Sequence, residues 1–388
     1  MPFLLIVIYI TFISLGLPDS LFGVSWPVVH VEFGIAQSFA SVYSIITGVC
    51  TGGVSFIAGT LIRKFGTGKV TFVSVLLTAI GMLGNSFAPN IVVMMLCSVI
   101  MGYGAGAIDT GLNNYVSLHY EARHMNWLHC FWGVGVTLSP IIMSQFLGGG
   151  TGVWRNGYRV VALIQFSIAL LVLLTQRYWH KEAVISDSQD GSSTQMSTMQ
   201  LLRIKGLGTS ILSLGLYCSA EFLLGTWGAS FAVEYFGIAP EEAARWVALY
   251  YGGIMLGRLV SGFVSIKATD NMLIRAGVLT SLAGIAVLML PLGKTALCGF
   301  LLIGFGFGPI FPSVLHSVPA RFGSTYSADI TGFHMGGAYA IGFLIQLAFG
   351  YIATATTFAI TQYVLLALCA GIFLANAHTV TVLKKANN

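Results

Sequence analysis

Long runs of apolar residues recur from one end of this 388-residue chain to the other. The mean hydropathy is +0.85, 56% of the residues are hydrophobic and only 8% are charged. A helix needs about 20 apolar residues to cross a bilayer, whereas outer-membrane strands alternate polar and apolar side chains over about ten residues. The runs here are continuous and rich in glycine, which is frequent in membrane-spanning helices. We therefore predict an all-α polytopic membrane protein.

Turn signals and charged clusters divide the chain into twelve expected spans. We place them at 4–31, 38–62, 70–88, 91–118, 126–147, 157–178, 206–235, 240–265, 271–291, 294–319, 327–353 and 355–378. The polar, Ser/Thr/Gln-rich segment 179–205 is typical of a linker. The expected organisation is a six-helix half at 1–178, a cytoplasmic linker at 179–205, a six-helix half at 206–378 and a tail at 379–388.

Lysine and arginine predict the orientation, because cytoplasmic loops carry an excess of both. Of the 18 such residues, 13 fall on the side that would hold both termini and the linker. We therefore expect cytoplasmic termini in an inner or plasma membrane. The same bias explains the net charge of +5 without a nucleic-acid partner. The first apolar run lacks a basic flank, so we interpret it as a span and not as a signal peptide.

The cysteines give no sign of a metal or redox site. All six fall within expected spans, with no CxxC pair and no His/Cys ligand spacing. Buried free thiols are the simplest interpretation. We expect no cofactor other than a coupling ion, and a monomer in the lipid bilayer.

The two expected halves repeat one another. Gly34-Ile35-Ala36 after the first span recurs as Gly237-Ile238-Ala239 after the seventh, and the glycines of 102–106 recur at 304–308. A duplicated six-helix unit is typical of transporters that alternate access to a substrate near the midplane. A channel or receptor has less need of such a repeat.

Three acids, Asp19, Asp109 and Glu221, lie inside the apolar runs. A carboxylate at membrane depth costs at least about 2.5–3.5 kcal/mol, so it persists where it faces a polar cavity, finds a partner or carries a proton. The acids therefore indicate a proton or substrate pathway. The alternative is that they pair with Arg or hydroxyl groups and only hold helices together.

Hydrogen-bonding and aromatic side chains accompany these acids at helical spacing. Asn113 lies one turn after Asp109, and His129 and Trp132 share one stripe of the fifth span. Carboxylate, amide and imidazole groups pair with sugar hydroxyls, while an aromatic face covers the apolar side of the ring. The other candidate substrate contacts are Asn114, Glu221, Trp227, His316, His334 and Gln346. For the histidines a bond to a neighbouring helix is the competing interpretation, and for Trp227 a place in the interfacial belt.

Four motifs carry a family resemblance: Leu17-Pro18-Asp19-Ser20-Leu21 with Trp26-Pro27, Gly102 to Thr110 followed by Asn113, Asn126 to Gly133, and Phe307 to Ser313. With the twelve spans, they resemble the major facilitator superfamily and, within it, the fucose permease group of sugar/proton symporters. The resemblance implies that Asp19 is chiefly involved in proton translocation and that Asp109 lies close to the sugar. Sequence alone leaves either acid able to carry the proton.

Two arginines, Arg63 and Arg258, are expected to have gating or structural roles. The segment 59–66 resembles the superfamily's loop between the second and third spans, but Arg63 stands where the usual acid helps to latch the cytoplasmic side. The latch is therefore absent or rebuilt, or Arg63 is simply a positive-inside anchor. Arg258, within the eighth span, is expected to neutralise an acid or to brace a helix end.

The function predicted from these features is proton-coupled import of a monosaccharide. A carboxyl group removed from water holds its proton more tightly, so it can load a proton outside and release it inside with the sugar. Sodium coupling is an alternative, since acids and Asn also bind Na⁺. A proton/drug antiporter is the second candidate, although its cavity should contain aromatic and Met side chains with few amides. A sensor would need a soluble output domain, and an enzyme a catalytic motif; we find neither.

Overall fold

The chain is helical throughout the part that the computed structural model describes, residues 2–120, 122–179, 200–201, 203–291, 293–323 and 327–387. These ranges contain no strand. The helices are α1 (Pro2–Phe33), α2 (Phe39–Phe65), α3 (Thr67–Phe87), α4 (Ile91–His119), α5 (Ala122–Leu147), α6 (Trp154–Leu174), η1 (Gln176–Tyr178), α8 (Leu207–Phe236), α9 (Pro240–Val264), α10 (Asp270–Met289), η2 (Gly293–Ala296), α11 (Leu297–Phe307), α12 (Ile310–His316), α13 (Val318–Phe322), α14 (Ser327–Ala355) and α15 (Ile360–Asn387).

The helices match the expected spans in number and order. Among the described residues, eleven helical segments are long and apolar enough to cross a membrane, and α2 makes a twelfth when its bent parts, Phe39–Ser55 and Ile57–Phe65, count as one. The prediction of an all-α polytopic protein is confirmed. The α15 helix continues through the expected tail at 379–388 as far as Asn387. No Gly or Pro follows Gly371 to end the helix.

The chain forms two compact units, of which the first is Met1–Ser186 with Gly225–Ala248 and the second is Asp187–Leu224 with Leu249–Asn388. This division differs from the two halves expected from sequence, since 225–248 group with the first half. A close approach of α1 and α8 explains the grouping: a Cβ on Gly23 would lie 3.0 Å from the Thr226 Cα. Most of the expected linker, 180–199, lies outside the described residues.

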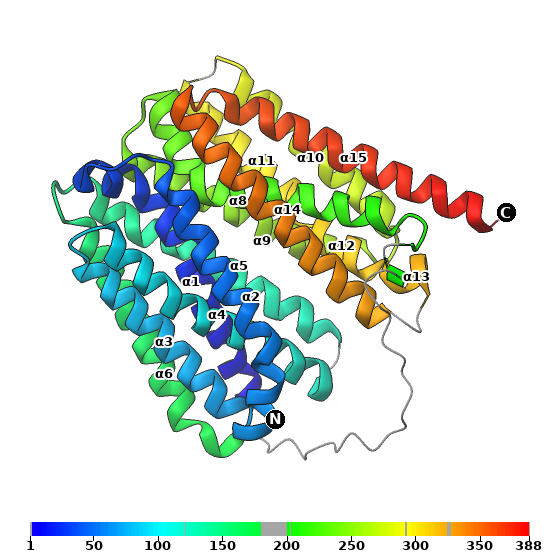
Figure 1. The fold of residues 1–388 in the computed structure, drawn as a ribbon, viewed down its shortest axis with the longest axis horizontal. Helices are drawn as coiled ribbons and strands as arrows, with labels where there is room; N and C mark the ends of the chain where they lie inside the picture. Colours follow the sequence, from blue (N-terminus) through cyan, green and yellow to red (C-terminus); the bar gives the residue numbers. More distant parts are fainter. Residues whose placement is uncertain are drawn as a thin grey trace. The chain divides into compact units, whose positions relative to one another are not determined.

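In the first unit α1 packs against α5 and α6, while α4 packs against α2 and α3. Figure 1 shows α1 to α6, coloured blue to green, as one bundle. In the second unit α10 packs against α11, α12 and α15. The packed helices bring together side chains from distant parts of the chain.

The repeated glycines make equivalent contacts in the two units. A Cβ on Gly102 would lie 2.6 Å from a backbone oxygen of α2, and one on Gly104 would lie 2.6 Å from a backbone oxygen of α3. In the second unit a Cβ on Gly304 would lie 3.1 Å from a backbone nitrogen of α9, and one on Gly306 would lie 2.6 Å from a backbone nitrogen of α10. Both glycine runs therefore let one helix pack closely between two others, as small residues do in membrane bundles.

The expected tenth span is interrupted. Its helix stops at Phe307 and resumes as α12 at Ile310. Pro309 lies at this break, and a proline has no backbone N–H for the hydrogen-bond ladder. The motif 307–313 therefore marks a break in the span.

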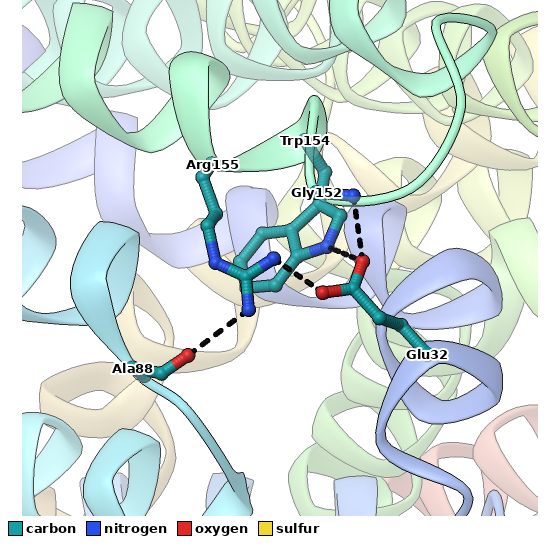
Figure 2. A network of polar contacts seen from close by, with 5 residues as sticks. All are labelled: Glu32, Ala88, Gly152, Trp154 and Arg155. Atoms are coloured by element: carbon teal, nitrogen blue, oxygen red, sulfur yellow. Dashed lines mark hydrogen bonds and ion pairs between the residues drawn. The ribbon is translucent and has the colours of Figure 1, made fainter.

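A polar network fixes the end of the first unit where α1 turns toward α2 (Figure 2). The Glu32 carboxylate accepts hydrogen bonds from the Gly152 N–H at 2.8 Å and the Trp154 Nε1–H at 2.7 Å, and it forms an ion pair with Arg155. Arg155 also donates to the Ala88 carbonyl at 3.1 Å. The network ties together the ends of α1 and α3 and the start of α6. Charge-assisted bonds of this kind are the strong ones in proteins.

Candidate functional site

Asp19 lies on α1 where this helix packs tightly on α5. A Cβ on Gly16 would lie 2.8 Å from the Val136 N, so only glycine allows the approach. Pro18 removes the N–H that would bond the Ser14 carbonyl four residues earlier. Gln165 of α6 fills that gap, because its Nε2–H donates to the Ser14 carbonyl at 2.6 Å.

The proline of α5 is compensated in the same way. Pro140 leaves the Val136 carbonyl without its helical donor. The Ser20 hydroxyl of α1 donates to this oxygen at 2.9 Å. Ser20 directly follows Asp19, so this bond and the glycine contact fix the rotation of α1 that sets the direction of the acid.

The carboxylate of Asp19 is bound by an indole. Trp132 Nε1–H donates to Asp19 Oδ2 at 2.8 Å. Asp19 is exposed, although the adjacent Pro18 and Ser20 are buried. Sequence analysis predicted Trp132 as a sugar-stacking residue, and the structure gives it a direct contact with the acid. An indole N–H is a neutral donor, so it brings no charge to the carboxylate.

Asp109 and Asn113 form a second pair, within α4. Asn113 Nδ2 donates to Asp109 Oδ1 at 2.8 Å and to the Asp109 carbonyl at 2.9 Å. The amide oxygen of Asn113 is buried and has no hydrogen-bond partner among the described residues. A buried amide oxygen of this kind is an acceptor that a ligand hydroxyl can satisfy.

The remaining candidates of the first unit occupy different surroundings. The His129 ring packs edge-to-face on Phe12, with centroids 5.9 Å apart. Trp227 is fully buried, a position unlike that of an interfacial-belt residue. Arg63 is exposed, and its Nη2 donates to Thr60 Oγ1 at 3.2 Å. The side chain of Asn114 lies outside the described residues.

Glu221 has a cationic partner in the second unit. Arg258 Nη2 lies 3.7 Å from Glu221 Oε1, and the two side chains are only 13% and 12% exposed. The Tyr250 hydroxyl donates to the Glu221 backbone carbonyl at 3.4 Å. Arg258 was expected to neutralise an acid or to brace a helix end, and it lies beside Glu221, a candidate substrate contact. The distance exceeds the 2.7–2.9 Å of a charge-assisted hydrogen bond.

The other candidates of the second unit do not gather around Glu221. Buried His334 of α14 shares a hydrogen bond with Ser210 Oγ of α8, at 2.8 Å from its Nε2. His316 is 83% exposed and lies 3.0 Å from an Asp270 carboxylate oxygen. Gln346 is buried on α14. The structure thus gives both histidines contacts that join helices, and their substrate roles stay predictions.

The roles of Ser20, Gln165 and Ser210 in holding the helices that carry the candidate residues were not predicted from the sequence. For Ser20 and Gln165 the prolines were a usable signal. Each proline inside a helix leaves the carbonyl four residues earlier without a donor, so a polar partner is required. The spacing does not say which helix supplies it.

The described residues contain no group of three or more His, Cys, Asp or Glu side chains that could hold a metal ion. The candidate site of the first unit consists instead of two carboxylates, each with a neutral N–H donor. Such groups can bind hydroxyl groups and exchange protons.

Comparison with known proteins places this fold. The sequence pattern of the Major Facilitator Superfamily matches residues 8–347. A Helicobacter pylori protein (strain ATCC 700392 / 26695) assigned provisionally as a glucose/galactose transporter is 24% identical over 240 residues, which is 58% of each chain. A glucose/mannose transporter of Bacillus subtilis (strain 168) is 22% identical over 69% of this chain and 68% of its own. The match therefore spans less than two thirds of the length of the Helicobacter relative.

The fold is shared with a solved structure of the Escherichia coli fucose:proton symporter, with a TM-score of 0.64 and 16% identity over 97% of this chain and 98% of that one. This likeness concerns the fold. The family match covers most of the chain and confirms the prediction of a transporter and not an enzyme. The chain therefore belongs to the Major Facilitator Superfamily of multi-pass membrane transporters.

Proposed function

We propose that this protein imports a monosaccharide together with a proton by alternating access, with both termini in the cytoplasm. The observation that carries the proposal is the pair of first-unit acids bound by neutral donors, Asp19 by Trp132 and Asp109 by Asn113. The indole and amide groups that bind these acids stay neutral whether the acid is ionised or protonated. A protonated acid carries no charge, so the protein can change the side to which the site opens at a low electrostatic cost.

The second-unit acid differs in this respect. Protonation of Glu221 would leave Arg258 as a buried, uncompensated charge, and breaking a buried ion pair costs about 3–5 kcal/mol. Glu221 therefore suits a role in holding substrate or helices. Of the two first-unit acids, we assign the transported proton to Asp19 and place Asp109 on the substrate side, as the family resemblance implies.

The sugar assignment draws on the chemistry around Asp109. The carboxylate accepts from hydroxyls, and the buried amide oxygen of Asn113 offers a second acceptor one turn away. Two adjacent acceptors match neighbouring hydroxyl groups of one ring. The relatives named as glucose, galactose or mannose transporters support the same class of substrate.

The test is uptake by proteoliposomes under an imposed pH gradient, with radiolabelled hexoses, 6-deoxyhexoses and pentoses offered one at a time. We expect concentrative uptake of at least one sugar that a protonophore abolishes. A sodium gradient applied alone separates sodium coupling from proton coupling. Failure of every sugar, together with gradient-driven export of a dye, would replace the proposal with a proton/drug antiporter.

A further inference from the structure

A second cluster with titratable groups lies at the end of α1, away from the acids of the candidate site. It consists of His30 on α1, Gln37 in the turn before α2 and Glu234 on α8. His30 follows Asp19 by eleven positions on the same helix, which corresponds to about 16 Å of helical rise. Nothing in the proposed transport reaction uses these side chains.

Gln37 is the centre of this cluster. Its Nε2 lies 3.1 Å from His30 Nε2 and 3.0 Å from Glu234 Oε1. The Trp26 indole N–H donates to the Gln37 carbonyl at 2.9 Å, and the Gln37 side chain is buried. The backbone of this turn is therefore anchored. The side-chain amide of Gln37 points to two partners, His30 and Glu234.

The partners fix the protonation state of the histidine. His30 Nδ1 lies 3.3 Å from the Ile35 carbonyl, which can only accept, so Nδ1 carries a proton. His30 Nε2 faces the NH₂ group of Gln37, which can only donate, so Nε2 accepts. The neutral imidazole and the Glu234 carboxylate thus each receive one hydrogen of the same amide.

Glu234 is the charged group that faces His30 in this cluster. Glu32, two positions further along α1, is already bound by Gly152, Trp154 and Arg155. The contact of α8 with α1 and α2 continues through uncharged groups, with Ser44 Oγ and Thr226 Oγ1 3.5 Å apart. Within this contact His30 is the group that can change its charge near neutral pH.

We propose that His30 is a second proton-binding residue of this transporter and that a proton on its Nε2 releases α8 from the α1–α2 turn. A proton on Nε2 places two donors face to face. If the Gln37 amide turns to offer its oxygen to His30, the same oxygen faces the Glu234 carboxylate and repels it. The bridge is therefore formed with neutral histidine and broken with the imidazolium.

The consequence for transport rests on the proposed function. Under alternating access with cytoplasmic termini, this end of α1 faces the outside, and α8 must part from α1 and α2 when the outer side opens. Acidification adds a proton to a histidine, so an acidic exterior would favour opening. The same proton gradient that drives uptake would then also favour loading.

The test is a distance measurement that needs no substrate. Spin labels at Ala36→Cys and Ala239→Cys, both exposed loop positions, report the separation of the α1–α2 and α8–α9 turns. The labelled protein, with its native cysteines replaced, is placed in nanodiscs and examined by double electron–electron resonance at about pH 5.5 and about pH 8. We expect the longer-distance population to grow roughly threefold or more at the lower pH.

Three variants sharpen the result. His30→Gln keeps an acceptor for Gln37 but cannot take up a proton, so its distances should not respond to pH. Glu234→Gln removes the repelled carboxylate and should weaken the response, whereas His378→Gln, at an exposed histidine of the second unit, should respond as the wild type does.

The proposal would be overturned if the spin-label distances in the wild type did not change with pH. It would also be overturned if His30→Gln responded to pH as the wild type does. Shortening at low pH would also overturn it, because it would mean that the imidazolium pairs directly with Glu234. A pH response without uptake of any sugar would leave this inference standing and would refute only the proposed substrate.

Discussion

The described contacts of the acids differ between the two units. In the first unit Asp19 is bound by an indole N–H and Asp109 by an amide, both neutral donors. In the second unit Glu221 lies beside the Arg258 guanidinium. A neutral donor can stay beside an acid that takes up a proton. An arginine favours the ionised acid, because a protonated acid no longer balances its positive charge. This comparison supports the proposal that protons exchange in the first unit, whereas the second unit holds an ion pair.

The largest effect is expected from Asp19→Asn, which keeps the size of the side chain and removes the exchangeable proton. Uphill accumulation of substrate in proteoliposomes should be abolished, while exchange of labelled for unlabelled substrate continues. Glu241→Gln, in the first turn of α9, is the control for loss of a carboxylate outside the candidate site. Concentrative uptake at the wild-type level would remove Asp19 from the proton pathway.

Glu221→Gln should act differently, because it leaves Arg258 charged without its partner. We expect a loss of stability of about 3–5 kcal/mol or a lower affinity for substrate, with proton-driven accumulation retained. The double variant Glu221→Gln/Arg258→Gln should recover part of the stability, as measured by thermal unfolding in detergent. An equally large loss in the double variant would show that the pairing is energetically unimportant.

Substrate affinity should fall when the Asp109–Asn113 pair is broken. Asp109→Ala or Asn113→Ala should weaken binding by about 1–3 kcal/mol, since each leaves a buried polar group unpaired. This corresponds to roughly 5- to 150-fold in Kd, measurable by calorimetric titration of the sugar. Unchanged affinity in both variants would place the sugar elsewhere.

A smaller effect is expected at the contact that orients Asp19. Ser20→Ala removes the donor for the Val136 carbonyl beside Pro140 and should reduce stability by about 0.5–1.5 kcal/mol. Ser167→Ala, an exposed serine that bonds its own helix, is the matched control and should be near neutral. Equal effects in thermal unfolding would show that the α1–α5 contact does not depend on this bond.

The fold was predictable because its signals are local. Apolar run length predicted the twelve spans, and the repeated glycines around 102–106 and 304–308 indicated a duplicated unit, which the structure shows in equivalent helix contacts. The partners of the acids were less accessible. Asn113 follows from helical spacing, but Trp132 meets Asp19 only through the crossing of α1 and α5 at Gly16 and Gly135, which sequence spacing does not encode.

Two details of the structure could not be predicted from hydropathy or helical spacing. The α15 helix passes the expected end of its span because hydropathy marks the membrane boundary and not the end of the backbone hydrogen bonding. His316, a candidate substrate contact, lies on α12 after the break at 308–309 and is exposed beside Asp270. Tertiary packing, not periodicity, decides such contacts.

Proton movement driven by sugar is the most direct measurement of the central claim. Proteoliposomes without an imposed gradient are given a sugar gradient in weakly buffered medium, and the external pH is followed. The account predicts alkalinisation that persists in Glu221→Gln and is absent in Asp19→Asn, although the latter still exchanges sugar. Alkalinisation that persists in Asp19→Asn but is lost in Glu221→Gln would contradict it and make the arginine-paired acid the carrier of the proton.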